Sequence, residues 1–147
     1  MTGREIYPKD IISCICLSDY NEMYLGLEEQ GVAKLDLVTG TVTRLQLSDN
    51  PAAPLFVRHI LQYSPDELWI GTESGIVVYN IRTRRYQHLK SSPYDPYSLS
   101  DNAVYSLCKD REGGLWIGSF FGGINYLPQR NSDFEKYYHT DDPHSLR

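Results

Sequence analysis

Histidine and cysteine side chains are the groups in this 147-residue sequence that could hold a metal ion or act as a nucleophile or base. Cys14 and Cys16 lie two residues apart in an apolar run and Cys108 is far from both, so the cysteines form no pair at the spacing of a zinc site. The histidines show no metal-binding or carboxylate–histidine spacing either. They are His59, His88, His139 and His144. We therefore expect buried, unreactive thiols, structural or solvated histidines, and neither a metal site nor a cofactor.

The charged side chains do not form a catalytic set. The carboxylates are scattered along the chain, and no pair of them stands where acid–base catalysis could be assigned. A basic cluster between residues 82 and 90 is interpreted as a solvated strand edge, where charge prevents edge-to-edge pairing; docking to an acidic neighbour is the alternative. We assign no catalytic residue and expect a protein that is not an enzyme.

Aromatic pairs in polar segments offer a third chemistry, because an aromatic face can stack on a sugar ring or on a protein partner. Phe120 is the first choice as a stacking platform, and Glu73 and Arg58 are weaker choices for polar contacts. The alternative is that these aromatic side chains pack loops onto each other. The candidate ligand-binding residues are Phe120, Phe121, Tyr94, Tyr97, Glu73 and Arg58.

Composition and charge exclude several classes of protein. An apolar content of 41% indicates a folded, globular chain, and a net charge of −5 argues against the basic face that nucleic-acid binding needs. No run of about 18 apolar residues is present, and the N-terminal residues lack the apolar core of a signal peptide. We expect no nucleic-acid partner and no membrane contact by this segment.

A repeated tryptophan–glycine segment organises the chain and must position these side chains. The run Gly113–Gly118 reads Gly-Gly-Leu-Trp-Ile-Gly, and it recurs as Leu-Trp-Ile-Gly ending at Gly71 and as Met-Tyr-Leu-Gly ending at Gly26. The aromatic position repeats after 45 and then 47 residues. A period in this range indicates a repeat architecture.

Each repeat predicts four short strands, because its apolar runs are β-branched and too short for helices. The predicted strands lie near 11–17, 22–27, 31–37, 41–47, 56–63, 67–72, 75–81, 84–90, 102–109, 114–119, 122–128 and 133–139. The sequence therefore predicts an all-β fold of three four-stranded antiparallel blades of a β-propeller, a partial propeller. The blades span about 10–47, 55–90 and 101–139, and residues 140–147 are interpreted as the start of a further blade.

Loop lengths differ between the two edges of the predicted blades. The first and third turns keep the same length in all three units, whereas the second turns and the connections between blades vary. All the variation therefore falls on one face of the ring, which is where binding sites usually lie on repeat scaffolds. Phe120 and Phe121 occupy a second turn, at a position where the other units carry charge, and Tyr94 and Tyr97 occupy a connection.

The third unit resembles the two-component regulator propeller repeat. The resemblance rests on residues 100–119 and on the Gly-Gly-Ile that ends at Ile124. The second unit keeps Leu-Trp-Ile-Gly-Thr, and the first has Tyr24 in place of the tryptophan, so weaker similarity extends over roughly residues 10–139.

The resemblance implies the periplasmic sensor region of Bacteroides-type hybrid two-component histidine kinases. Propellers of that kind precede a membrane helix and a kinase, and many sense products of polysaccharide breakdown. The expected function is therefore a fragment of a ligand-sensing propeller whose ligand is an oligosaccharide, with kinase activity confined to a longer parent. A propeller segment that mediates protein assembly without a small ligand is the alternative.

The predicted blade number has a consequence for association. A propeller blade packs against neighbours on both faces, so three blades leave two apolar end faces, which is more than monomers usually expose. We expect self-association through these faces, as a dimer or a larger assembly, for example two half-rings that close to six blades.

Overall fold

The computed structural model describes residues 10–129 and, for the backbone alone, residues 135–137. Every regular element in this part of the chain is a β-strand. The first sheet contains β1 (Ile12–Leu17), β2 (Glu22–Leu27), β3 (Gly31–Asp36) and β4 (Val42–Arg44). The second contains β5 (Val57–Ser64), β6 (Glu67–Thr72), β7 (Gly75–Asn80) and β8 (Tyr86–Leu89). The third contains β9 (Val104–Lys109), β10 (Leu115–Ser119), β11 (Ile124–Leu127) and β12 (Glu135–Tyr137).

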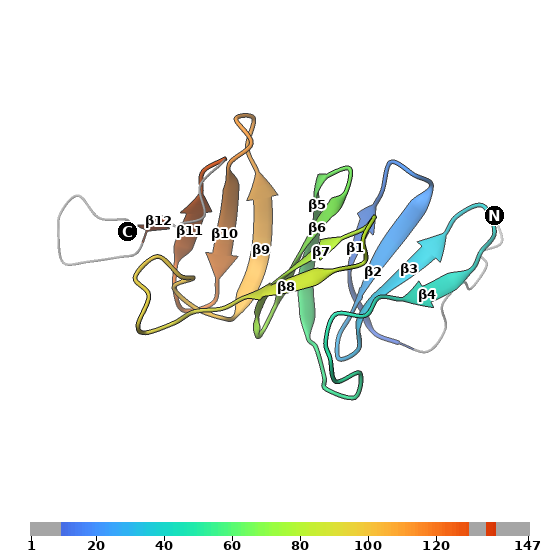
Figure 1. The fold of residues 1–147 in the computed structure, drawn as a ribbon, viewed down its shortest axis with the longest axis horizontal. Helices are drawn as coiled ribbons and strands as arrows, with labels where there is room; N and C mark the ends of the chain where they lie inside the picture. Colours follow the sequence, from blue (N-terminus) through green and yellow to red (C-terminus); the bar gives the residue numbers. More distant parts are fainter. Residues whose placement is uncertain (1–9, 130–134, 138–147) are drawn as a thin grey trace.

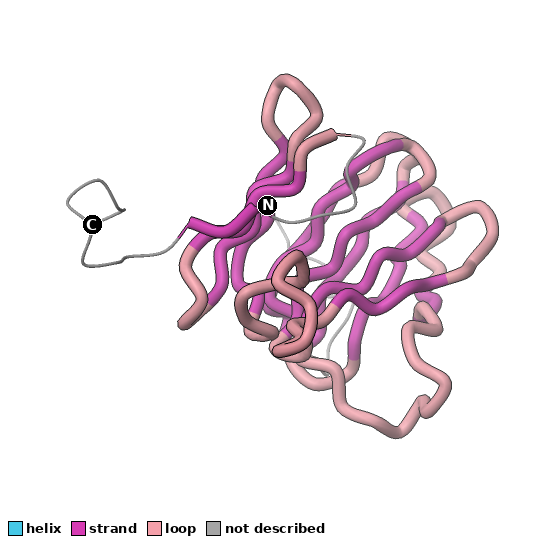
Figure 2. The backbone as a smooth tube through the Cα atoms, turned by 60° about the vertical axis from the view of Figure 1, so that its left-hand side comes forward, coloured by secondary structure: helices cyan, strands magenta, loops and turns pink. Residues whose placement is uncertain are grey.

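Each sheet is an antiparallel four-stranded meander in chain order. Figure 1 shows the three sheets side by side as the blades of an arc. β5 lies against both β1 and β9, so the first strands of neighbouring blades adjoin one another. Figure 2 shows the same sheets from another side, with the loops gathered at the ends of the strands. The predicted all-β partial propeller is confirmed.

The strand boundaries follow the sequence pattern closely. Eleven of the observed strands lie inside the predicted ranges, and β5 extends one residue further, to Ser64. The fourth strands are shorter than predicted, since β4 has three residues and β8 has four. A fourth strand pairs on one side only, which leaves its ends less constrained. The predicted start of a further blade at 140–147 lies outside the described residues.

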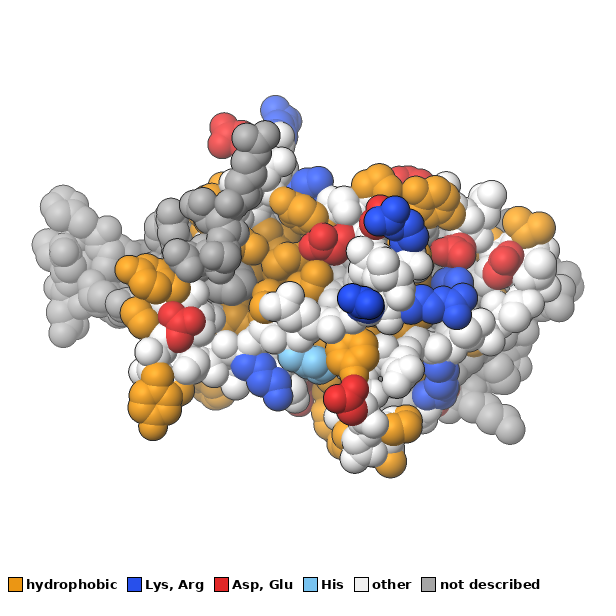
Figure 3. Space-filling model, in the orientation of Figure 1, with side chains coloured by type: hydrophobic (Ala, Val, Ile, Leu, Met, Phe, Trp, Pro, Cys, Tyr) orange, Lys and Arg blue, Asp and Glu red, His pale blue; other side chains and the backbone are white. Residues whose placement is uncertain are grey.

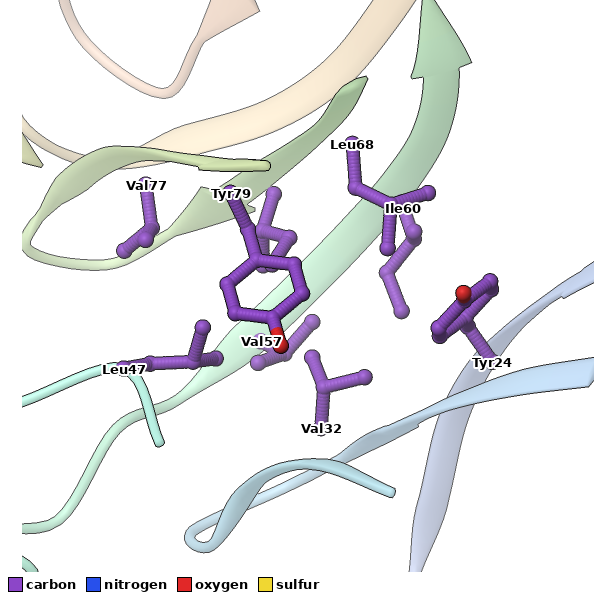
Figure 4. Packing of buried hydrophobic residues seen from close by; sticks show 9 residues of the cluster. Tyr24, Val32, Leu47, Val57, Ile60, Leu68, Val77 and Tyr79 are labelled. Carbon is purple, nitrogen blue, oxygen red and sulfur yellow. The ribbon is translucent and has the colours of Figure 1, made fainter. Parts of the chain in front are cut away.

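The apolar side chains of the second strands pack between the blades. One cluster between the first and second blades contains the buried residues Tyr24, Ile60 and Tyr79, whose packing is drawn in Figure 4. A second cluster between the second and third blades contains Trp69 and Leu107. The repeated aromatic position therefore contributes to the blade-to-blade core, because side chains alternate between the two faces of a strand.

The third turns of the first and second blades are closed by side chains. Asp36 Oδ1 accepts hydrogen bonds from the backbone N–H groups of Val38 and Thr39, at 2.8 and 3.0 Å. Asn80 Oδ1 accepts the equivalent bonds in the second blade, at 3.0 and 2.9 Å. A short polar side chain can satisfy the backbone of a tight turn in this way, which makes the turn length constant between repeats.

Gly71 permits close approach of the second and third blades. A Cβ atom at this position would lie 2.9 Å from Val104 Cγ1, and one at Gly26 would lie 2.8 Å from Val57 Cγ1. Val57 and Val104 are the first residues of β5 and β9 and are fully buried. Gly26 and Gly71, which lie next to last in the second strands of the first two blades, are thus the positions on which the next blade packs.

Candidate functional site

The variable loops meet at one edge of the arc, which we call the loop rim. It consists of the turns that follow β2, β6 and β10 together with the connections 45–56 and 90–103, and it forms the lower edge in Figure 1. Backbone hydrogen bonds join these loops: Gly31 N–H donates to Leu55 C=O at 3.1 Å, and Gly75 N–H donates to Asn102 C=O at 2.6 Å. Turns and connections that are distant in sequence are therefore held as one surface.

An ion pair lies on this rim at the seam between the second and third blades. Arg58, on β5, donates from Nε to Oε1 of Glu73 at 3.1 Å, and its Nη2 contacts the same oxygen. Glu73 is held by its own backbone, because its N–H donates to Phe56 C=O at 3.1 Å. The arginine and the carboxylate both remain partly exposed. Two of the six predicted site residues are therefore in direct contact.

Tyr105, on β9, connects this pair to the third blade. Its hydroxyl donates to Glu73 Oε1 at 3.2 Å, and its ring lies beneath the Arg58 guanidinium, whose carbon is 5.2 Å from the ring centroid. An arginine over an aromatic face is a favourable cation–π arrangement. Tyr105 thus orients the ion pair from across the seam.

Phe120 and Phe121 extend the aromatic surface. The Phe120 ring lies 5.3 Å from that of Tyr105 and 4.5 Å from that of Phe121, centroid to centroid, and both phenylalanines are exposed. Their turn is anchored by its backbone, since Phe120 N–H donates to Ala103 C=O at 2.9 Å and Phe121 N–H donates to Asp101 Oδ2 at 3.0 Å. The exposed rings therefore project from a backbone that is fixed on both sides.

We call this set of side chains the rim cluster. It comprises Arg58, Glu73, Tyr105, Phe120 and Phe121. Within the described residues, Arg58 Nη1 and Glu73 Oε2 have no hydrogen-bond partner, so the cluster presents a donor and an acceptor beside an aromatic face. This combination suits a ligand that has both hydroxyl groups and an apolar ring face.

The structure does not bring Tyr94 and Tyr97 into the rim cluster. Both are exposed, at 94% and 59%, and their backbone N–H groups donate within their own loop, to Ser92 and Asp95. In the described part of the chain, no hydrogen bond or ring contact links either tyrosine to the cluster.

Sequence reasoning did not include Tyr105, although a signal was present. Tyr105 occupies the repeat position of Arg58, one residue after the buried valine that begins the first strand of the blade. Because Arg58 was selected as a site residue, the residue at the matching position of the third unit was also a candidate. The strand register shifts between Val104 and Ser106 of β9, so Tyr105 does not follow the regular alternation of side chains between the two faces of the sheet.

A concave region of the rim lies apart from the rim cluster. A groove of about 740 Å³ runs between the turn after β2 and the connection after β4. It is lined by residues 29–31, 44–48 and 50–55, which include none of the predicted site residues and no aromatic side chain. The aromatic stacking surface and this groove are therefore separate features of the same edge.

Glu73 is expected to titrate at low pH. The hydrogen bond from Arg58 holds the pKa of the Glu73 carboxyl below its ordinary value of about 4.3, and the Tyr105 hydroxyl acts in the same direction. Because the folded-state pKa is the lower one, the stabilisation from ionised Glu73 is present above the unfolded-state pKa and is lost as pH falls through the folded-state pKa. In an NMR titration of the side-chain carboxyl carbon, the Glu73 midpoint should lie below that of an unperturbed glutamate and should rise in Arg58→Met; an unchanged midpoint would contradict the ion pair.

The cysteine and histidine side chains of the described residues lie in surroundings that suit a structural role. Cys14 and Cys16 are partly buried, and burial raises the pKa of both thiols. Cys108 is exposed, so the prediction of a buried thiol is wrong there, because it lies on the opposite face of β9 from Leu107, which packs against the second blade. Burial lowers the pKa of His59, and His88 Nε2 lies 2.8 Å from Leu47 C=O. His139 and His144 lie outside the described residues.

The described residues contain no group of three histidine, cysteine or carboxylate side chains that could hold a metal ion. They also contain no helix that is long and apolar enough to cross a membrane. Figure 3 shows basic and acidic side chains interspersed over the visible face, without a large patch of one sign.

Comparison with known proteins identifies the repeat. The family model described as two-component regulator propeller matches residues 98–121, in agreement with the predicted resemblance. Histidine kinase P4 of Formosa agariphila is 37% identical over 70 residues, which are 47% of this chain and 5% of that protein. The chain thus spans a small part of the curated relative that it matches.

Solved structures share the fold. The extracellular domain of a B. thetaiotaomicron protein described as a hybrid two-component system superposes with a TM-score of 0.71 at 23% identity, over 96% of this chain and 17% of that one. A second extracellular domain from the same organism, described as a one-component system, has a TM-score of 0.72 at 22% identity, over 97% and 18% of the two chains. At these identities the likeness establishes the propeller fold.

Proposed function

We propose that this chain, which carries a two-component regulator propeller repeat, forms part of the periplasmic ligand-sensing propeller of a hybrid two-component signalling protein. The observation that carries the proposal is the match of residues 98–121 to that repeat. It is supported by the similarity to a histidine kinase and by the extracellular domains that share the fold. The proposed ligand is an oligosaccharide derived from a polysaccharide.

The rim cluster is the proposed contact surface for the sugar. Phe120 and Tyr105 supply adjoining aromatic faces on which a pyranose ring can stack. Arg58 Nη1 can donate to one sugar hydroxyl, and Glu73 Oε2 can accept from another. These groups come from two blades, so a bound sugar would bridge the seam between them. A ligand that bridges the seam can change the position of one blade relative to the other.

The cluster is suited to binding more than to catalysis. Glu73 is paired with Arg58, and its pKa is lowered, so it stays ionised at neutral pH and has no proton to donate as a general acid. As a base it would have to leave the ion pair first. The proposed function is therefore recognition, and kinase activity would belong to other parts of a longer protein.

The test is sugar binding by the chain itself. We expect oligosaccharides released by limited hydrolysis from neutral and acidic polysaccharides to perturb the ring resonances of Phe120 and Tyr105 in an NMR titration, with weak affinity. Phe120→Ala should reduce the affinity about 5- to 10-fold, the effect of losing one stacked ring. Tyr94→Ala is the control, because it removes an exposed ring from the same rim outside the cluster.

Each result of the titration has a defined meaning. Binding that is weakened by Phe120→Ala and unaffected by Tyr94→Ala supports the proposed site. Binding that neither variant changes, or perturbations that cluster around the groove lined by residues 44–48, would contradict the assignment of the rim cluster. Failure of every oligosaccharide to perturb the spectrum would favour the alternative, a segment that mediates protein assembly.

A further inference from the structure

The charges of the rim cluster are already paired before a ligand arrives. Arg58 is the one cation of the cluster, and its Nε and Nη2 both donate to Glu73 Oε1. These two nitrogens form the side of the guanidinium that usually receives a carboxylate or a sulfate through two parallel hydrogen bonds. Glu73 therefore occupies the place that an anionic group of a ligand would take.

Further carboxylates lie around this pair. The negative charge of Glu28, in the turn after β2, raises the pKa of Arg58, so this carboxylate lies near enough to act on the guanidinium. Asp101 lies against the turn that carries the phenylalanines, because its Oδ2 accepts from Phe121 N–H at 3.0 Å. Three carboxylates thus stand against one guanidinium, and the surroundings of the aromatic surface are on the negative side of neutral.

Lys90, which follows β8, does not change this balance. Its aliphatic stem lies beside Gly75, where an added Cβ atom would be 3.3 Å from Lys90 Cγ. In the part of the chain that the structure describes, no ion pair joins Lys90 to the carboxylates of this seam. The positive charge that acts on Glu73 is that of Arg58, which also lowers the pKa of the Glu73 carboxyl.

We infer that the rim cluster selects neutral sugars and discriminates against oligosaccharides that carry carboxylate, sulfate or phosphate groups. This inference rests on the proposed sensory function and names the class of its ligand. A neutral pyranose can stack on Phe120 and exchange hydroxyl hydrogen bonds with the ion pair while Arg58 and Glu73 stay together. An acidic sugar would bring a negative charge towards Glu73 and Asp101, and like charges at close range repel.

Glu73 is the residue that determines this selectivity. Its carboxylate both compensates Arg58 and repels an incoming anion. Glu73→Gln keeps the size of the side chain and an oxygen that can accept from Arg58, but it removes the negative charge. The guanidinium charge is then uncompensated by its nearest partner and available to an anionic ligand.

The experiment compares sugars that differ only in charge. The probes are short oligosaccharides from polygalacturonate and alginate, before and after their carboxyl groups are reduced to primary alcohols, together with oligosaccharides from neutral polysaccharides. Binding to the complete chain is followed through the ring resonances of Phe120 and Tyr105 in about 20 mM salt, where charges are weakly screened. Neutral probes should bind, and each acidic probe should bind at least about fivefold more weakly than the tightest neutral one.

Two variants assign the selectivity to Glu73. Glu73→Gln should raise the affinity for the acidic probes at least about tenfold and change the affinity for neutral probes by less than about threefold. Glu112→Gln is the matched control, because it removes the same charge from the exposed turn after β9, at the opposite edge of the third blade. It should leave both affinities unchanged.

The outcomes separate this inference from the proposed function on which it rests. An acidic probe that binds the wild type as tightly as the neutral probes would overturn the inference and leave oligosaccharide sensing intact. An equal gain of acidic binding in Glu73→Gln and Glu112→Gln would overturn the assignment to Glu73, since net charge would then explain it. Failure of every probe to bind would contradict the proposed function, and the inference with it.

Discussion

Replacing Gly75 with alanine is expected to destabilise the chain by about 3 kcal/mol or more. Gly75 begins β7 with a φ of +110°, a conformation that costs an L-residue about 1–2 kcal/mol by itself. An added Cβ atom would also lie 2.3 Å from the carbonyl oxygen of Leu89, which is backbone and cannot rotate away. The pairing of β7 with β8 would have to shift. The loss of hydrogen bonds between these two strands would therefore add to the conformational strain at Gly75.

Gly40→Ala is the matched control for this prediction. Gly40 also has a positive φ, of +75°, but an added Cβ atom there would meet nothing within 4 Å. The loss of stability in Gly40→Ala should therefore be limited to the conformational cost, about 1 kcal/mol. The two variants are compared by urea denaturation, from the midpoint and its slope. Equal losses would show that the close contact with Leu89 does not decide the cost at Gly75.

Trp69→Ala is expected to destabilise the chain by about 3–5 kcal/mol, the usual cost of removing a buried aromatic side chain. Trp69 is 7% exposed, packs in the cluster between the second and third blades, and lies 6.0 Å from the Tyr63 ring. Its Nε1 donates to Glu67 Oε1 at 2.6 Å, so the substitution also removes a hydrogen bond. The variant would leave a cavity at the seam that both blades share.

Trp116→Ala tests whether burial causes the effect at Trp69. Trp116 occupies the same repeat position and its Nε1 donates to Asp110 Oδ2 at 3.0 Å, but it is 37% exposed. At a protein concentration low enough for the monomer to predominate, its substitution should cost about half as much, since less apolar area is lost. Equal losses for the two tryptophans, measured by urea denaturation, would contradict this order.

The Trp69 prediction also concerns the candidate site. Arg58 and Glu73 belong to the second blade, and Tyr105 and Phe120 belong to the third. The contacts between the two pairs therefore exist only while the seam beneath them is packed. A cavity left by Trp69→Ala should loosen the contact of Tyr105 with Glu73 before the chain unfolds.

Most of the fold could be predicted from local pattern. A constant spacing of 12 residues between Val57 and Trp69, and the same spacing in the other units, predicts a first strand, a fixed turn and a second strand. Asn80 at a turn position predicts a loop closed by its own side chain, which the structure contains. These features depend on residues that are close in sequence, so the sequence alone contained the information.

The candidate site was predicted less completely. Loop lengths and residue types selected Arg58, Glu73 and Phe120 as candidates, and the structure joins them into a cluster through Tyr105. The same argument also selected Tyr94 and Tyr97, whose loop directs them elsewhere, and it omitted Tyr105. Loop membership limits where a side chain can lie, but it does not determine which side chains touch.

The sequence by itself thus determined the strands, the turns and the blade repeat, because hydrophobic alternation and turn chemistry act over a few residues. The tertiary structure alone decided which side chains meet across the seam between the second and third blades. Arg58 and Tyr105 are 47 residues apart in the chain, and their contact depends on how closely one sheet packs on the next. How closely the two sheets approach is controlled by Gly71, against which Val104 packs, and by the buried Trp69. No local sequence pattern describes this packing.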